Sequence, residues 1–226
     1  MNIITYSDIG KRKLNEDVIL VKELHPNTIF AIIADGMGGY ESGDKAAKLI
    51  VENIEIYLRS LNTNVYLRND IEKAIHNSNQ ILKQFNEHYN IKSGATIAGA
   101  IITERQTIVF WVGDVQIDLL KNNESVFKSE PHTLIQDMKK HLKLVSSEMI
   151  KKYKHIVTKS ISGKMETIDF GYYELKSHKF DQLIISSDGV HNCIDPSQLV
   201  FQYVDELNIF LKEYASDNNS YILIQK

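Results

Sequence analysis

The spacing of apolar residues along the chain predicts strands at its start and two long helices after them. Short segments rich in Ile and Val predict strands over residues 3–7, 18–24 and 28–34. Apolar residues then recur three, four and seven positions apart, which predicts a helix over residues 43–61. A second helix follows, with Asn69 as its expected N-cap. Its buried stripe is expected to consist of Ile71, Ala74, Ile75, Ile81, Leu82 and Phe85.

The second half of the chain is richer in strands. We expect strands over residues 95–102 and 107–120, the latter joined to a hairpin partner by the turn at 121–124. The polar segment that follows contains two short predicted helices, at 132–140 and 147–153. The other expected elements are strands at 156–161, 167–175 and 182–186, a short helix that starts at Pro196, a helix at 205–214 and a closing strand at 221–225. Because strands and helices do not alternate strictly, this order predicts an α+β fold with antiparallel sheets.

Length and composition limit the classes of function. The 226 residues contain no linker-like stretch, so we expect one domain over residues 1–226. The 26 Lys and Arg against 29 Asp and Glu argue against general nucleic-acid binding. A single cysteine, Cys193, excludes a disulfide framework and a cysteine-based zinc site. Charges throughout the first twenty residues, and the lack of a run of ~18 apolar residues, predict a cytoplasmic protein that does not contact membranes.

Four aspartates stand at the ends or interruptions of apolar runs: Asp35, Asp114, Asp188 and Asp217. Because an antiparallel strand ends beside the start of its neighbour, Asp35, Asp188 and Asp217 can share one sheet edge. Carboxylates within ~4 Å repel by about 4 kcal/mol per pair at an effective dielectric near 20, so such a cluster favours bound cations. An all-oxygen site suits Mg²⁺ or Mn²⁺. The alternative for Asp35 and Asp188, each followed by Gly, is ordinary turn chemistry.

Eight segments spread over nearly the whole chain form a further pattern. They are SDIGKRKLNED, ADGMGGYESG, SGATIAGAII, WVGDVQIDLL, PHTLIQDM, IVTKSISG, ISSDGVHNCI and SDNNSYILIQ. In this order and approximate spacing they resemble the motifs of the PPM (PP2C-type) family of metal-dependent protein serine/threonine phosphatases, in its bacterial form. The resemblance implies a four-layer αββα sandwich, with two antiparallel sheets packed face to face and helix pairs outside.

The resemblance also implies a site for two divalent ions, Mn²⁺ or Mg²⁺, at one end of the sandwich. Asp35 would bridge both ions, with the carbonyl of Gly36 and Glu16 on one of them and Asp188 and Asp217 on the other. Two ions about 3.5–4 Å apart generate a bridging hydroxide near neutral pH. This hydroxide would attack phosphorus in line, so no phosphoenzyme is expected.

Three further residues have implied roles, each with a simpler alternative. Arg12 would hold the phosphate oxygens with its planar fork of donors, or else it is a surface charge between Lys11 and Lys13. Asp17 would bind a metal directly or act through a water molecule. Asp114 would help to hold a third, weaker ion, or else it stabilises a hairpin.

Several positions depart from the family pattern. Val115 and Gln116 replace the usual Ser-Arg, Pro131 stands where an Asp is usual, and Lys159 replaces a common Arg. Met37 takes the place of a His that animal relatives carry as a proposed general acid, and bacterial-type members share this Met. The lysine-rich segment between residues 132 and 156 corresponds to the flap that shapes substrate access. Its lysines either steer phosphorylated substrates or form a solvated face.

Two functions are therefore compared. The first is a monomeric signalling enzyme that hydrolyses phosphoserine and phosphothreonine in proteins, with a cognate Ser/Thr kinase as a partner. The second is a catalytically weak or inactive binding or regulatory module on the same fold, which the departures at Val115, Gln116 and Pro131 would explain. No metal-binding acid of the family pattern is missing, and this favours the enzyme.

Overall fold

Ten strands form two antiparallel sheets in the computed structural model, which describes residues 1–37, 42–142 and 144–226. The first sheet has the order β1-β10-β9-β6-β7. Its strands are β1 (Asn2–Asp8), β10 (Asn219–Gln225), β9 (Gln182–Ser186), β6 (Gln116–Lys121) and β7 (Glu124–Lys128). The second sheet has the order β2-β3-β4-β5-β8. Its strands are β2 (Asp17–His25), β3 (Thr28–Met37), β4 (Gly94–Ile102), β5 (Gln106–Val112) and β8 (Gly171–Lys176).

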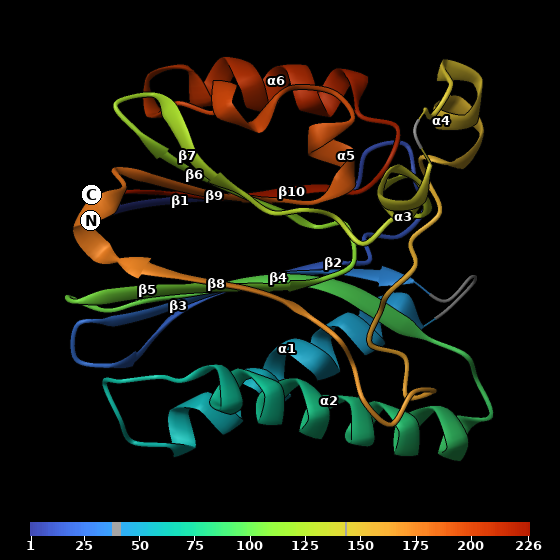
Figure 1. The fold of residues 1–226 in the computed structure, drawn as a ribbon, viewed down its shortest axis with the longest axis horizontal. Coiled ribbons are helices and arrows are strands. Elements are labelled where there is room, and N and C mark those ends of the chain that lie inside the picture. Colours follow the sequence, from blue (N-terminus) through green and yellow to red (C-terminus); the bar gives the residue numbers. More distant parts are fainter. Residues whose placement is uncertain (38–41, 143) are drawn as a thin grey trace.

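Helices cover the outer faces of both sheets (Figure 1). The long helices α1 (Gly43–Ser60) and α2 (Arg68–Tyr89) lie on the second sheet, and α6 (Val204–Tyr214) lies on the first. The short helix α5 (Asp188–His191) follows β9 on the same side as α6. Single-turn helices are found at Ser177–Lys179, Pro196–Gln198 and Phe201–Tyr203. The α+β sandwich predicted from the sequence is therefore confirmed.

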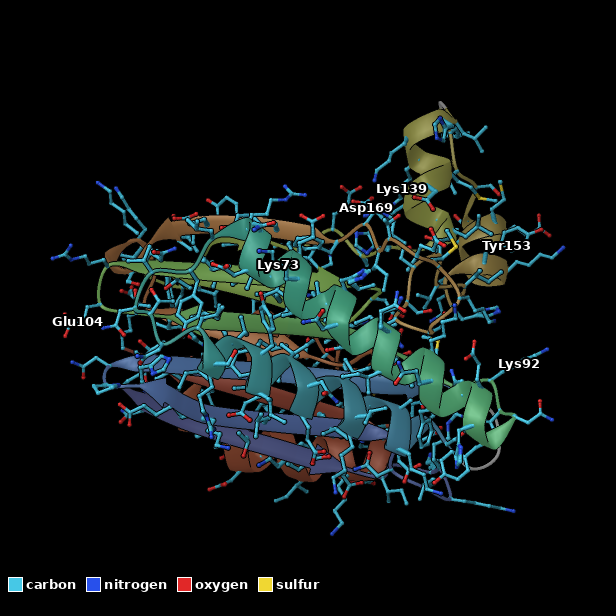
Figure 2. All side chains as sticks on the ribbon, turned by 90° about the horizontal axis from the view of Figure 1, so that it is seen from below. Lys73, Lys92, Glu104, Lys139, Tyr153 and Asp169 are labelled. Carbon is cyan, nitrogen blue, oxygen red and sulfur yellow. The ribbon has the colours of Figure 1, made fainter. Side chains whose placement is uncertain are left out.

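The helices α3 (Leu134–His141) and α4 (Ser147–Tyr153) stand at one end of the sandwich. Figure 2 shows the segment that carries Lys139 and Tyr153 projecting from this end, with Glu104 at the opposite one. None of the helices in the described part of the chain combines the length and apolarity that a membrane span requires.

Three buried apolar clusters hold the sandwich together: one under α1 and α2, one between the sheets, and one between the first sheet and α6. Alternate residues of β3 face opposite sides, so Ile33 packs between the sheets and Ile32 packs under the helices. Strand β4 is buried along its whole length, which explains why its sequence is almost entirely apolar. The apolar stripe of α1, which includes Ile50 and Ile54, is fully buried against the second sheet.

Several expected elements differ from the structure. The single strand expected over residues 107–120 is two strands, because the chain passes from the second sheet to the first at Gly113, whose φ is +103°. In place of the strand expected at 156–161, the structure has only isolated bridges, Thr133 to Val157 and Ala95 to Ile161. Helix α2 has Leu67 rather than Asn69 as its N-cap.

Candidate active site

The strand-end acids predicted from the sequence meet at the end of the sandwich near α3 and α4. Asp17 begins β2 and lies directly opposite Asp35 on β3. Asp188 comes two residues after the end of β9, and Asp217 comes two residues before the start of β10. Because β9 and β10 pair antiparallel, with Ser186 opposite Tyr221, the end of one lies beside the start of the other. The antiparallel register thus gathers acids that are up to 200 positions apart, from Asp17 to Asp217.

The loop before β2 carries Arg12 and Glu16, and Asn218 holds it in place. The side-chain amide of Asn218 donates to the carbonyls of Ile9 (3.0 Å) and Leu14 (2.9 Å). Its Oδ1 accepts the backbone N–H of Glu16 at 2.9 Å. Asn218 therefore fixes this loop to the turn that carries Asp217.

Arg12 is the cation closest to Asp217. Its Nη2 donates to Asp217 Oδ2 at 2.5 Å, and 60% of the Arg12 side chain is exposed. The hydrogen bond with Asp217, and then its charge, raise the pKa of the guanidinium further above its ordinary value. Arg12 is thus a permanently charged, solvent-facing donor at the edge of the acidic cluster.

Glu16 lies where β2, β3 and α1 meet. Its carbonyl accepts the backbone N–H of Gly36 at 3.1 Å. Its carboxylate lies so close to Gly43 that a Cβ at that position would collide with Oε1. Burial raises the pKa of the Glu16 carboxyl, and a hydrogen bond from the backbone of Gly43 partly opposes this rise. A side chain at position 43 would therefore displace the Glu16 carboxylate from the start of α1.

Burial and mutual repulsion raise the pKa values of the central carboxyls. Burial raises the pKa of Asp17 to about 6, although hydrogen bonds to Ser220 and Ser187 oppose the rise. Burial, and then the charges of Asp17 and Asp188, raise the pKa of Asp35 well above its ordinary value. The pKa of Asp188 rises to about 7, again mainly through burial. Cations would relieve this electrostatic cost.

Asp114 lies in the turn between β5 and β6. The N–H of Gly113 donates to His132 Nδ1 at 3.1 Å, and the N–H of His132 donates back to the Gly113 carbonyl at 2.8 Å. Burial lowers the pKa of His132 to about 4, so its ring is neutral and can accept this bond. The pKa of Asp114 is raised by burial. His132 therefore ties the turn that carries Asp114 to the start of α3.

The donor chemistry of the cluster fits divalent cations. The side chains supply oxygen atoms only, as Mg²⁺ and Mn²⁺ prefer. The buried Oδ1 of Asp17 has no hydrogen-bond partner among the residues that the structure describes, and Oδ2 accepts from Ser187 Oγ at 2.8 Å. Among the described residues, no three His, Cys, Asp or Glu residues are arranged so that they could hold a metal ion as they stand. The acids are therefore neighbours, but their carboxylates do not yet point toward a common metal position.

Comparison with known proteins identifies the family. The model of the family described as protein phosphatase 2C matches residues 5–219. This chain belongs to the protein phosphatase 2C family. It is 28% identical over 207 residues to the protein phosphatase PhpP of Streptococcus pneumoniae, covering 88% of this chain and 82% of that protein. It is 26% identical over 204 residues to the serine/threonine phosphatase stp of Listeria monocytogenes, covering 85% and 79%.

Solved structures show the same fold. The serine/threonine phosphatase of S. agalactiae superimposes with a TM-score of 0.86 over 98% of both chains, at 23% identity. The serine/threonine phosphatase Stp1 from Staphylococcus aureus gives a TM-score of 0.85 over 99% of this chain and 94% of that one, at 19% identity. The protein phosphatase 2C sandwich expected from the motifs is thereby confirmed.

The departures from the protein phosphatase 2C pattern are accommodated without disrupting the sandwich. Val115 is buried between the sheets. Gln116 donates through Nε2 to Asp118 Oδ2 at 2.5 Å. Lys159, which replaces the common Arg of the protein phosphatase 2C pattern, forms an ion pair with Asp169, so a cation still occupies this position. Residues 38–41 of the second motif and Lys143 of the lysine-rich segment lie outside the described residues.

Three residues that support the site had no role assigned from the sequence. They are Asn218, which anchors the loop of Arg12; Ser187, which binds Asp17; and Gly43, which makes room for Glu16. Asn218 and Ser187 lie within the motifs around Asp217 and Asp188, so the motifs themselves were the available signal. Their contacts depend on residues that are distant in the sequence.

Proposed function

We propose that this protein phosphatase 2C chain is a metal-dependent enzyme that hydrolyses phosphoserine and phosphothreonine in proteins. The observation that carries the proposal is the gathering of Asp17, Asp35, Asp188 and Asp217 at one end of the sandwich, beside the exposed cation of Arg12. The family membership and the names of the relatives support it.

The chain's acids would hold the ions. Asp35 would serve both ions, with Glu16 and the carbonyl of Gly36 on one of them and Asp188 and Asp217 on the other. Asp17 would either bind an ion directly or act on it through a water molecule. Asp114 would help to hold a third ion. When bound, the ions, Mn²⁺ or Mg²⁺, supply a nucleophile activated at neutral pH and neutralise charge on the phosphate. The repulsion among the free carboxylates is the reason that these residues would take up cations.

Arg12 would bind the phosphate group of the substrate. Its guanidinium is exposed and always charged, and Asp217, which accepts from Nη2, is its one side-chain partner among the described residues. This bond orients the guanidinium over the acidic cluster, so that phosphate oxygens held by Arg12 would lie beside the carboxylates. No side chain of the protein is needed as a covalent nucleophile.

Phosphorylated proteins, and a Ser/Thr kinase that produces them, are the proposed partners. The relatives that support this are named as serine/threonine phosphatases. The substrate group would approach from solvent, because Arg12 lies at the exposed edge of the cluster.

A chromogenic phosphate ester assayed with added Mn²⁺ tests the proposal. We expect turnover that requires the metal and that is lost in Asp35→Asn. The matched control is Asp181→Asn, because Asp181 precedes β9 at the far end from Asp188 and pairs with Lys121. Metal-dependent turnover should survive in this control. No metal-dependent turnover in the unmodified chain would favour the inactive regulatory module instead.

A further inference from the structure

A cleft of about 250 Å³ lies between the acidic cluster and the projecting segment that carries α3 and α4. One wall includes Asp114 and Asp188. The opposite wall comes from α3, with Gln136 and Lys139, and from the residues just after α4, Lys154 and His155. The proposed reaction centre and two lysines therefore face the same cavity.

The lysine wall is held by backbone hydrogen bonds. The N–H of Leu134 donates to the carbonyl of Ile156 at 2.9 Å, and the N–H of Thr158 donates to the carbonyl of His132 at 2.9 Å. These bonds connect the start of α3 with the chain that follows α4. The backbones that carry Lys139 and Lys154 are thus joined into one unit, which favours a defined spacing between the two cations.

Lys139 and Lys154 are exposed, and neither has an ion-pair partner among the described residues. Their neighbour Lys140, by contrast, pairs with Glu130 at 3.2 Å. His191 also lines the cleft, but burial lowers its pKa to about 4, so it is neutral at pH 7. Lys139 and Lys154 are therefore the permanent positive charges that the cleft offers to a ligand.

We propose that Lys139 and Lys154 select substrates that carry acidic side chains next to the phosphorylated residue. This inference rests on the proposed function, because it places the phosphate at the acidic cluster. With the phosphate there, the adjoining peptide residues would extend into the cleft toward the lysine wall. A Glu or Asp side chain would find two unpaired cations, whereas a neutral side chain would gain no such attraction.

The experiment compares two phosphoserine peptides, with Glu in one and Gln in the other at the three positions on each side. We measure kcat/KM by phosphate release with Mn²⁺ for the unmodified protein and for the double variant Lys139→Gln and Lys154→Gln. The matched control is Lys140→Gln with Lys152→Gln. It removes the same charge from the same two helical regions, but neither of its residues lines the cleft.

We expect the unmodified protein to prefer the acidic peptide by roughly threefold to tenfold at low salt, as expected for two exposed ion pairs. The preference should shrink as salt is raised. It should vanish in the cleft variant and persist in the control. The control variant should hydrolyse the small chromogenic ester as fast as the unmodified protein does, because neither of its residues lines the cleft.

Equal turnover of both peptides by the unmodified protein would overturn the inference. Equal loss of preference in both double variants would also overturn it, because the charge would then act at long range and not through the cleft. Fluorescence anisotropy of labelled peptides in Mn²⁺ separates this inference from the proposed function. Binding that prefers the acidic peptide through Lys139 and Lys154, without ester turnover, would uphold the cleft and refute the phosphatase.

Discussion

Replacing Asp188 with Asn should stabilise the metal-free protein at neutral pH, although it removes a proposed metal ligand. Burial and the charges of Asp114 and Asp217 raise the pKa of Asp188 from an ordinary 3.8 to about 7. The folded chain therefore binds this proton more tightly than the unfolded chain does. As pH rises from about 4 to about 7, the unfolded state loses its proton first, and the folded state loses stability relative to it.

The full difference in pKa corresponds to about 4 kcal/mol above pH 7. Asp188 is partly exposed, so solvent screening reduces this figure, and we expect about 2 kcal/mol. Asn keeps the shape of the side chain but carries no charge. In EDTA at pH 7.5, Asp188→Asn should thus be more stable than the unmodified protein by about 2 kcal/mol, and near pH 4 the two should be equal.

Urea unfolding at several pH values, with EDTA or with Mn²⁺, measures this effect. Mn²⁺ should reverse the order, since an ion at 100 times its dissociation constant stabilises the unmodified protein by about 2.7 kcal/mol. The control is Asp181→Asn at the other end of β9. Hydrogen bonds from Lys121 and Asn122 lower the pKa of Asp181, so its replacement should destabilise the protein with or without Mn²⁺.

The reasoning is refuted if Asp188→Asn destabilises the EDTA-treated protein equally at pH 4.5 and pH 7.5. Such a result would mean that burial and the acidic neighbours do not raise the pKa of Asp188. A stability order that Mn²⁺ leaves unchanged would instead remove Asp188 from the metal site.

Three other replacements test the supports of the site. Gly43→Ala should displace Glu16 and weaken Mn²⁺ activation of ester turnover by about 10-fold to 100-fold, measured by metal titration, while the melting temperature changes little. Asn218→Ala removes three hydrogen bonds from the 9–16 loop and should cost about 2–3 kcal/mol of unfolding free energy in urea; an unchanged midpoint would contradict this. Arg12→Ala should lower kcat/KM about 100-fold, and Arg12→Lys should restore only part, because ammonium lacks the planar fork.

The sequence by itself predicted the elements with strong apolar patterns. The helix expected at 43–61 is α1, and the strand expected at 182–186 is β9. Local spacing is sufficient for these elements, because each buries one continuous stripe or run. The acids that end the strands also followed from the sequence, since antiparallel pairing brings strand ends together.

Only the tertiary structure decided which sheet each strand joins. Residues 107–120 look like one apolar run, but Gly113 turns the chain from the second sheet to the first. An alternating pattern indicates that a strand has one buried face, but it does not indicate which partner covers that face. The same limit applied at 156–161, where an apolar run forms isolated bridges and no strand.

The supports of the site also needed the folded chain. Asn218 binds Ile9 and Glu16, which are more than 200 positions away, and Ser187 binds Asp17 from the other sheet. The cleft combines a turn between strands with α3 and the residues after α4. Hydrogen bonds and cavities between distant segments leave no periodic trace in the sequence, because they depend on where the backbone places each residue and not on its neighbours along the chain.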